Sequence, residues 1–476
     1  MRNIISCFII KVALLAGVFA VAVTGCQKNK IYDGENAQLH FSEEIMTFDT
    51  VFTTIGSITK ILKVNNPYKN TVKTDIALIS GGNSYFSVNV DGVFGTVFKD
   101  VEIRGKDSIF IFVKVNINPN NQNMPIFISD TLAFSTNGNR QNVELRAFGE
   151  DANFILSDTK IEDSDGDTIS CKIIAKAGET ITWTNTKPYV IYGYAVISPN
   201  AKLIIDAGTQ IYVHKNGGIL VSPEGCINVN GTKEAPIVFQ GDRKPPLEYD
   251  NAQWCGIWIS EGRTDNIINY AVIKNAIIGI RAESSKENMG NKLLLTNTEI
   301  RCSQHIGFMG KNYNVQAYNN IFSISENYCV SLSGGSYTFI HNTVYNQYFS
   351  RKMIPSVKFS NDTTDFTCFF VNNIVYGNFD KELQCSSNSN ARFELFIENC
   401  LIKTEKSILD NYSIYSDVIF NQNPSFKDVK NANVLKYDFS LNDNSPCKRA
   451  GKTIVEVPTD IVGTTRNNPP SIGAYE

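Results

Sequence analysis

The residues with the clearest chemical potential are the two tryptophans of Trp254-Cys255-Gly256-Ile257-Trp258-Ile259. In an extended strand, alternate side chains face opposite sides, so this pattern predicts Cys255, Ile257 and Ile259 in the core. Both indoles then point outward on either side of a glycine and form a flat platform that can stack on sugar rings.

Polar and aromatic side chains close to this platform complete a candidate carbohydrate-binding site. The residues we assign to it are Trp254, Trp258, Tyr249, Arg243 and Asp242. The alternative is that Tyr249 and the Pro245-Pro246 loop fold over the indoles, or that the N-terminal domain docks there, because an exposed aromatic patch otherwise needs covering.

The densest acidic run is Asp163-Ser-Asp165-Gly-Asp167, which has the composition of a calcium loop. An EF-hand places its glycine sixth and a glutamate twelfth. Here the glycine is fourth and the twelfth residue is Ile174. The run therefore favours a polar linker or turn, with loose recruitment of Ca²⁺ by its clustered carboxylates as the alternative. No other metal or cofactor is indicated.

The N-terminus carries a different kind of chemistry. Arg2 and Lys11 flank the start of an apolar run that ends at Val23-Thr24-Gly25-Cys26. This is the pattern of a secretory signal, and a cysteine after Thr-Gly resembles the lipobox of bacterial lipoproteins, in which the thiol is acylated. We expect lipidation at Cys26 and attachment to a membrane through acyl chains. Gln27 at the next position favours the outer membrane, on its periplasmic face because Lys28 and Lys30 follow.

Composition limits the remaining classes of function. The chain has 476 residues, 4 histidines and a formal charge of −3, which argues against a nucleic-acid partner, since that needs a basic stripe. No later apolar run approaches the length of a membrane helix. Outside Cys7 and Cys26 the number of cysteines is odd and no C-x-x-C pair occurs. Several lie in strand-like runs, where a free cysteine behaves as a small buried hydrophobe.

The elements that position these residues are all expected to be strands. Residues 37–150 contain short alternating segments separated by Asn-Pro, Asp-Gly and Asn-Gly turns, as in an immunoglobulin-like β-sandwich. In residues 108–115 the alternation predicts a buried face of Ile109, Ile111, Val113 and Val115.

The second half contains internal repeats of an asparagine followed by apolar residues. The repeats begin at Asn269, Asn297, Asn319, Asn342, Asn372 and Asn399. Spacings of twenty to thirty residues without helical periodicity predict a parallel β-helix, with about three short strands in each coil. Asparagine suits the corners because it tolerates a left-handed backbone and its amides can bond from coil to coil. We therefore expect Asn297, Asn319 and Asn342 to stack.

Particular phrases resemble secreted right-handed β-helix proteins of the pectin-lyase-like superfamily, and more narrowly bacterial lipoproteins that join a β-sandwich to such a helix. These phrases include Lys187-Pro-Tyr-Val-Ile-Tyr-Gly193, Gln253-Trp-Cys-Gly-Ile257 and Ser471-Ile-Gly-Ala-Tyr-Glu476. The resemblance implies an all-β fold consisting of an immunoglobulin-like sandwich, a right-handed parallel β-helix and a C-terminal cap. It implies no settled activity.

The expected domains are a signal peptide (1–25), a tether (26–36), a β-sandwich (37–150), a linker and helix entry (151–180), a β-helix (181–415) and a C-terminal cap (416–476). A lyase of this superfamily would need a calcium-binding carboxylate cluster and a base, and a hydrolase would need paired aspartates. Neither is visible among the scattered acids of the repeats, so no catalytic residue is assigned. The sequence favours non-catalytic recognition of a polysaccharide or another envelope component. The alternatives are a polysaccharide lyase or glycoside hydrolase, and a structural module without a ligand.

Overall fold

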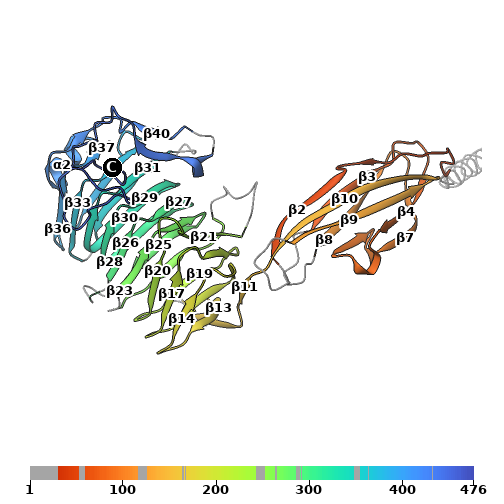
Figure 1. Cartoon of the computed structure of the whole chain (residues 1–476), viewed down its shortest axis with the longest axis horizontal. Helices are drawn as coiled ribbons and strands as arrows, with labels where there is room; N and C mark the ends of the chain where they lie inside the picture. The colour runs from red at the N-terminus through yellow and green to blue at the C-terminus, as the bar shows by residue number, and fades with distance from the viewer. Residues whose placement is uncertain are drawn as a thin grey trace, which may run out of the picture. The chain divides into compact units, whose positions relative to one another are not determined.

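The computed structural model describes residues 30–52, 59–115, 126–162, 166, 168–242, 252–262, 265–285, 290, 292–347, 354–362, 364–430 and 433–476. The chain divides into an N-terminal unit, residues 1–151, and a C-terminal unit, residues 152–476. Strands account for nearly all regular structure in both units (Figure 1).

The N-terminal unit contains two five-stranded sheets. The first sheet has the spatial order β1 (His40–Phe41), β3 (Lys60–Asn65), β8 (Ser108–Val115), β5 (Phe86–Val90) and β6 (Val93–Gly95). The second has the order β2 (Ile45–Phe52), β10 (Asn139–Glu150), β9 (Ile126–Thr136), β4 (Val72–Leu78) and β7 (Val97–Ile103). A short 3-10 helix, η1 (Gly81–Asn83), follows β4.

Alternation along the strands produces one apolar core between these sheets. In β8, Ile111, Val113 and Val115 are fully buried, while Ile109 is partly buried against the same cluster. The residues between them, Phe110 and Phe112, are exposed. The predicted buried face of this strand is therefore confirmed, and its opposite face is unexpectedly aromatic.

The C-terminal unit is built from two long sheets. The 11-stranded sheet consists of β11 (Asn153–Leu156), β15 (Tyr189–Tyr192), β18 (Gln210–Val213), β21 (Ile237–Gly241), β24 (Ala271–Lys274), β27 (Glu299–Ser303), β29 (Ile321–Ser325), β31 (Thr343–Asn346), β34 (Ile374–Gly377), β37 (Leu401–Ile402) and β39 (Ile419–Phe420). The 18-stranded sheet consists of β12 (Thr159–Glu162), β13 (Thr168–Ala175), β14 (Thr180–Trp183), β16 (Tyr194–Ile197), β17 (Lys202–Asp206), β19 (Gly218–Val221), β20 (Cys226–Asn230), β22 (Ile257–Ile259), β23 (Asp265–Asn269), β25 (Ile278–Glu283), β26 (Lys292–Thr296), β28 (Ile306–Tyr318), β30 (Tyr328–Ile340), β32 (Val357–Asn361), β33 (Phe366–Val371), β35 (Leu383–Ser387), β36 (Phe393–Glu398) and β38 (Ile414–Ser416).

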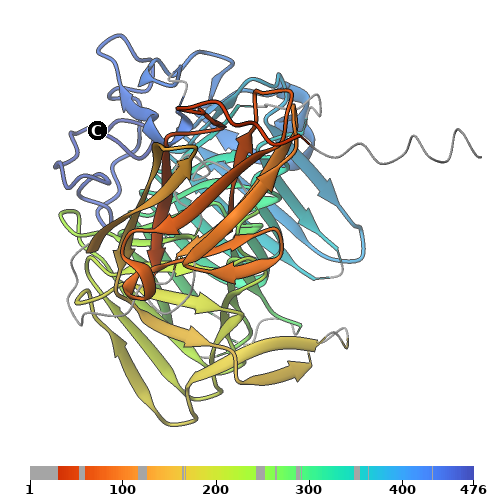
Figure 2. The same ribbon diagram turned by 90° about the vertical axis from the view of Figure 1, so that its right-hand side faces the viewer.

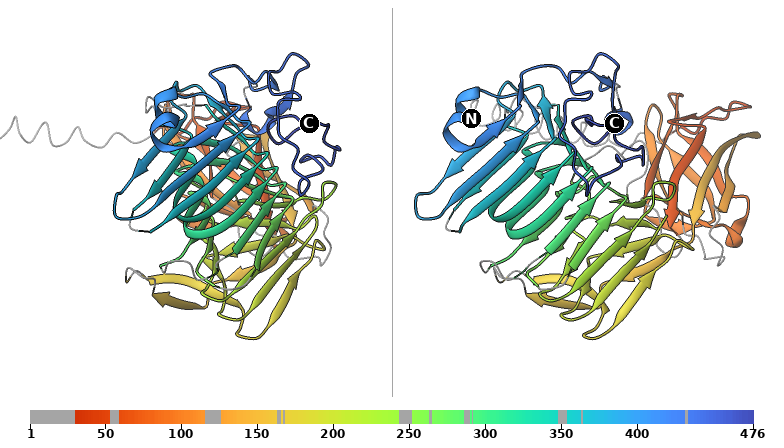
Figure 3. Two further views of the ribbon diagram at one scale, coloured as in Figure 1. Left: turned by 90° about the vertical axis from the view of Figure 1, so that its left-hand side faces the viewer. Right: turned by 60° about the vertical axis from the view of Figure 1, so that its left-hand side comes forward.

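Successive coils contribute one strand to the first of these sheets and two to the second, and the strands of neighbouring coils pair in parallel. In β28 and β30 the two contributions fuse into one strand. The antiparallel hairpin β12–β13 lies at the start of the stack (Figure 2), and the coils follow from gold to blue in Figure 3. The predicted parallel β-helix is confirmed. The interval 151–180, expected as linker and helix entry, contributes β11, β12 and β13 to its sheets.

One corner of the coils is marked by residues with left-handed backbone. The residues at this position in consecutive coils are Tyr270, Asn297, Asn319, His341, Asn372 and Asn399, with φ between 46° and 57°. The Nδ2 of Asn319 donates to Oδ1 of Asn297 at 3.2 Å, as predicted. The prediction is wrong for Asn342, because His341 occupies the corner and moves the asparagine one residue along the chain.

Asn342 instead belongs to a second, fully buried ladder immediately after the corner. Its Oδ1 accepts from both N and Nδ2 of Asn320 at 2.9 Å. Its own N and Nδ2 donate to Oδ1 of Asn373 at 2.8 and 2.9 Å. Each of these amides links neighbouring coils, so we call Asn320, Asn342 and Asn373 the inner ladder.

The C-terminal segment packs along the 11-stranded sheet. Ile461, Ile472 and Ala474 share an apolar cluster with Ile321 and Ile374 on that sheet. The hairpin β40 (Phe426–Asp428) and β41 (Asp438–Leu441), which encloses η3 (Val434–Lys436), adds to the same cluster.

The corner residues hold this segment in place through their polar groups. Asn319 accepts from Arg466 at 2.7 Å, and Oδ1 of Asn372 accepts from N of Lys452 at 2.8 Å. The main core of the β-helix receives Leu409 from the single α-helix of the described residues, α2 (Lys406–Tyr412), which packs against β35, β36 and β38. No helix in the described part of the chain has the length and apolar character needed to cross a membrane.

Replacing Asn342 with leucine should destabilise the C-terminal unit by about 2 kcal/mol or more. The substitution removes the acceptor for two buried donors of Asn320 and the Nδ2 donor to Asn373, while the backbone N–H of residue 342 remains. Unsatisfied buried donors are costly. Denaturant unfolding measures the effect. The matched control is Asn390→Leu at an exposed position, expected to change stability by less than about 0.5 kcal/mol. Equal effects of the two substitutions would contradict a role of the inner ladder in stability.

Candidate functional site

The predicted tryptophan platform does not form, because Trp254 is buried. Its side chain is 0% exposed within the β-helix core, and its Nε1 donates to the backbone oxygen of Lys274 at 2.9 Å. The cause is Gly256, whose φ of +107° interrupts the strand, so that regular alternation begins only at Ile257. A Cβ at Gly256 would lie 1.6 Å from the oxygen of Ile278. The expectation of two outward indoles is therefore wrong for Trp254.

Trp258 faces outward, but its indole is only partly exposed. It lies in register between Leu220 and Arg281 on the neighbouring strands. The Arg281 guanidinium lies 4.2 Å from the ring centroid, a cation–π contact. Trp258 also packs against a small apolar cluster that includes Val196. The indole is thus a packing element with a charged neighbour over one face.

The remaining predicted residues are not brought together with Trp258 by any described contact. Asp242 lies beside His214, with its Oδ2 2.6 Å from Nδ1, and the imidazole stacks on Tyr192 at 4.5 Å. Burial, together with the charge of Asp242, raises the pKa of Tyr192 to about 12. Arg243 and Tyr249 lie outside the described residues, as do the candidate calcium ligands Asp163, Asp165 and Asp167 and the candidate lipidation site Cys26. Among the described residues no group of three or more His, Cys, Asp or Glu side chains has the arrangement of a metal site.

The β-helix instead presents two aligned rows of side chains on the outer face of six strands that pair in succession from coil to coil. These strands are β23, β26, β28, β30, β33 and β36. The polar row is Asp265, Lys292, Asn314, Ser336, Thr367 and Glu394. The central row, two residues further along each strand, is Ile267, Leu294, Gln316, Thr338, Phe369 and Phe396. The residues between the rows, such as Leu293 and Tyr337, are buried in the core, as strand alternation requires.

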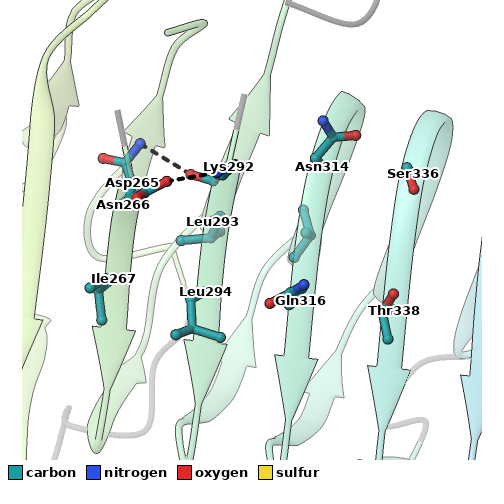
Figure 4. A pocket seen from close by; sticks show the side chains of 11 residues that line it. Asp265, Asn266, Ile267, Lys292, Leu293, Leu294, Asn314, Gln316, Ser336 and Thr338 are labelled. Atoms are coloured by element: carbon teal, nitrogen blue, oxygen red, sulfur yellow. Dashed lines mark hydrogen bonds and ion pairs between the residues drawn. The ribbon is translucent and has the colours of Figure 1, made fainter. Parts of the chain in front are cut away.

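Two adjoining hollows follow these rows. The first, with a volume of about 400 Å³, is lined from Asp265 on β23 to Thr338 on β30. Its side chains lie on the parallel strands β23, β26, β28 and β30 (Figure 4). The second, with a volume of about 610 Å³, includes Asp365 and Arg392. Both hollows are lined by Asn314 and Ser336, so together they extend across the coils.

Charged groups in these hollows are neutralised in pairs. Asp265 and Lys292 lie 3.4 Å apart. Asp365 accepts from N of Arg392 at 2.8 Å and from its guanidinium at 3.1 Å. The backbone N–H of Arg392 has the largest effect and lowers the pKa of Asp365; desolvation opposes it, and the guanidinium of Arg392 lowers the pKa further. This carboxylate stays ionised at neutral pH and is fixed in position by its partner.

The aromatic surface of this site comes from phenylalanine. Phe369 is 46% exposed, and its ring stacks on that of Phe396 with a centroid distance of 4.9 Å and an interplanar angle of 10°. Ile414, in register with Phe396 on the next strand, is also exposed. Alternation within Phe366–Val371 could have indicated that Thr367 and Phe369 face outward. The register between repeats, which assembles the rows, could not be obtained from one strand.

One strongly perturbed carboxyl group lies elsewhere. Glu382 is fully buried and accepts from N of Phe379 at 2.9 Å and from N and Oγ of Ser356. Burial raises its pKa to about 7, although these donors and Lys403 lower it. None of these residues lines the two hollows. Glu382 therefore joins the segments that precede β32 and follow β34, away from the hollows.

Comparison with known proteins supports the fold of the C-terminal unit. Residues 175–324 match a family model described as a pectate-lyase like beta helix domain, and this range includes β23, β26 and β28. No curated protein matches the chain.

Similarity to solved structures is weak. A protein of unknown function from Porphyromonas gingivalis is 14% identical over 25% of this chain and 54% of its own, with a TM-score of 0.18. The E. coli chaperone DraB is 9% identical over 30% of this chain and 83% of its own, with a TM-score of 0.18. The catalytic domain of a GH87 alpha-1,3-glucanase in complex with tetrasaccharides is 9% identical over 82% of this chain and 96% of its own, with a TM-score of 0.17. The chain thus spans about half the length of the P. gingivalis protein, and at these TM-scores none of the three supports a conclusion about function.

The buried Glu382 should make stability depend on pH. Its pKa rises from 4.5 to about 7 on folding, so the folded protein binds this proton more tightly than the unfolded chain. The resulting stabilisation is complete below pH 4.5 and is lost as the pH rises through about 7. Glu382→Gln, which cannot titrate, should remove this loss, on the order of 3 kcal/mol.

Thermal unfolding of the wild type and Glu382→Gln at about pH 5 and about pH 8 measures the difference. The control, Glu326→Gln at an exposed position, should follow the wild type. A pH dependence of Glu382→Gln equal to that of the wild type would show that this carboxyl group does not titrate in the range.

Proposed function

We propose that the C-terminal unit binds a linear polysaccharide across the strands of its outer face, without cleaving it. The observation that carries this proposal is the alignment of the polar row and the central row over six successively paired strands, one from each coil. Neighbouring strands are about 4.8 Å apart, so equivalent side chains recur at an interval comparable to the length of one sugar residue. A chain laid across the coils meets one side chain of each row at every step.

The chemistry of the two rows matches the two kinds of surface that a sugar presents. Hydroxyl groups can bond to amides and hydroxyls such as those of Asn314, Ser336 and Thr367. The apolar face of a pyranose ring can pack on Leu294 and on the stacked Phe369 and Phe396 rings, as aromatic side chains do in many ligand sites. Sites of this kind combine apolar area with a few orienting polar groups.

The carboxylates of the hollows favour binding over hydrolysis. A glycosidase needs one carboxyl group that remains protonated near neutral pH and a second carboxylate on the other side of the scissile bond. Asp365 has a lowered pKa and is held by Arg392. Among the described residues the carboxyl group with a raised pKa is Glu382, which is buried outside the hollows. Recognition without catalysis therefore accounts best for these groups.

Phe369→Ala should weaken polysaccharide binding about tenfold, since an aromatic contact contributes about 0.5–1.5 kcal/mol beyond the area that it buries. Its melting temperature should stay close to that of the wild type, because the ring is exposed. A glycan array that includes neutral and anionic polysaccharides, followed by titration of the retained glycans, provides the measurement. Phe110→Ala, at a comparably exposed position in the N-terminal unit, is the control. Unchanged retention by Phe369→Ala would rule out a contribution of this ring.

We also propose that the protein is a lipoprotein, anchored by Cys26 to the periplasmic face of the outer membrane. Support comes from the signal-like residues 1–25, from the Thr-Gly-Cys phrase and from Gln27, Lys28 and Lys30. In this proposal the N-terminal unit is an immunoglobulin-like sandwich that connects the anchor to a right-handed β-helix.

Cys26→Ser should abolish incorporation of labelled fatty acid and release the protein from the membrane fraction. Serine lacks the thiol that receives the acyl group, so the signal peptide remains uncleaved or the product is soluble. Metabolic labelling and cell fractionation measure both effects. Continued labelling of Cys26→Ser would disprove acylation at this position, and rapid loss of the wild type on protease treatment of intact cells would place the protein on the cell surface.

A further inference from the structure

The first sheet of the N-terminal unit has an outer face that is apolar and aromatic. Its four most prominent exposed side chains are Ile61 (51%), Phe94 (78%), Phe110 (51%) and Phe112 (41%), which we call the aromatic face. Monomeric proteins rarely leave large side chains of this kind grouped on one surface without a binding partner.

The strand register shows that these residues are neighbours. Ile61 on β3 is paired with Phe112 on β8, Phe112 with Asn89 on β5, and Asn89 with Phe94 on β6. Phe110 lies two residues from Phe112 on the same side of β8. The aromatic face therefore extends across β3, β8, β5 and β6.

The charged residues within the strands of this sheet all have one sign. Lys63 and Lys114 are exposed on β3 and β8, on the same side as the aromatic residues. Strands β1, β3, β5, β6 and β8 contain no aspartate or glutamate. Lysines beside exposed aromatic rings suit the interface of a membrane with anionic lipids, where rings enter the headgroup layer and lysines meet its negative charge.

The opposite sheet differs in this respect. It carries ion pairs of both signs, between Lys73 and Glu102 at 3.3 Å and between Lys99 and Asp75 at 2.7 Å. A surface of paired charges has little affinity for a bilayer. The two sheets of this unit are thus chemically distinct on their outer sides, and only the first matches a lipid surface.

The length of the tether places this unit close to the bilayer if Cys26 is acylated as proposed above. Three residues separate Cys26 from Lys30, and the oxygen of Lys30 accepts from N of Thr71 at 3.0 Å. The extended chain from Cys26 to Lys30 spans at most about 14 Å. Thr71 immediately precedes β4, so the chain enters the unit beside the start of that strand, where the connection from β3 ends.

We propose that the aromatic face is a second membrane contact, which lies on the lipid surface beside the acyl anchor and orients the rest of the chain. This inference rests in part on the proposed lipid anchor and is independent of polysaccharide binding. The bilayer supplies the apolar environment that Ile61, Phe94, Phe110 and Phe112 lack, and Lys63 and Lys114 contact its anionic headgroups.

The test uses the full mature chain with Cys26→Ser, so that no acyl group contributes, and vesicles of phosphatidylcholine with and without phosphatidylglycerol. The protein should sediment with the anionic vesicles. Phe94→Ser combined with Phe110→Ser should lower the fraction bound at least about tenfold, while Phe369→Ser, an exposed phenylalanine of the C-terminal unit, should have no effect. Unchanged melting temperatures would exclude unfolding as the cause.

Absence of sedimentation, or equal sedimentation of the double variant, would overturn the proposal. Concentration-dependent dimers that are lost in the double variant, without any binding to vesicles, would also overturn it and would identify a self-association surface. Lys63→Glu with Lys114→Glu should reduce binding to the anionic vesicles. If the variant with both phenylalanines replaced still retains the same glycans as the wild type, its loss of vesicle binding is independent of the proposed polysaccharide site. Fatty acid labelling tests the lipid anchor separately.

Discussion

The parallel register between successive coils is the constraint on which the rest of the C-terminal unit depends. Because side chains alternate along a strand, a slip of one residue would exchange the inner and outer faces of every strand that follows. The inner ladder opposes such a slip, since the amides of Asn320, Asn342 and Asn373 are buried and bond from one coil to the next. A shift in register would leave these groups without partners in an apolar core, which is costly.

The same register creates both surfaces of the β-helix. On the corner it aligns Asn319, His341 and Asn372, which share left-handed backbone and hold the C-terminal segment through Arg466 and Lys452. Burial and the nearby Arg466 lower the pKa of His341, so this imidazole stays neutral. On the strands that lead into this corner, such as β26, β28 and β30, the register aligns the polar and central rows. The two rows are therefore a direct product of the stack, and Asp365 and Arg392 join the site from the connections before β33 and β36.

Much of this architecture could be predicted from the sequence, because its signals are local. Alternation identified β8, and the asparagine repeats identified the coils. The errors arose where one backbone conformation changed the pattern: the positive φ of Gly256 turned Trp254 inward. The corner at His341 moved Asn342 to the inner ladder because a left-handed position does not require asparagine. The central row, which includes Gln316 and Phe369, could not be predicted, because it depends on how strands from different coils pair. The loops between these strands differ in length, so the sequence does not reveal that register.

If the rows form one continuous binding surface, affinity must depend on the length of the ligand. The most direct measurement is calorimetric titration of the full chain with a series of oligosaccharides of increasing length, prepared from a polysaccharide that the protein retains. We expect the affinity to rise with each added sugar until the ligand spans the six strands that carry the rows, of which β23 is the first and β36 the last. It should then remain constant. Affinity that is already maximal for a monosaccharide or disaccharide would contradict a continuous surface and would indicate a single local pocket instead.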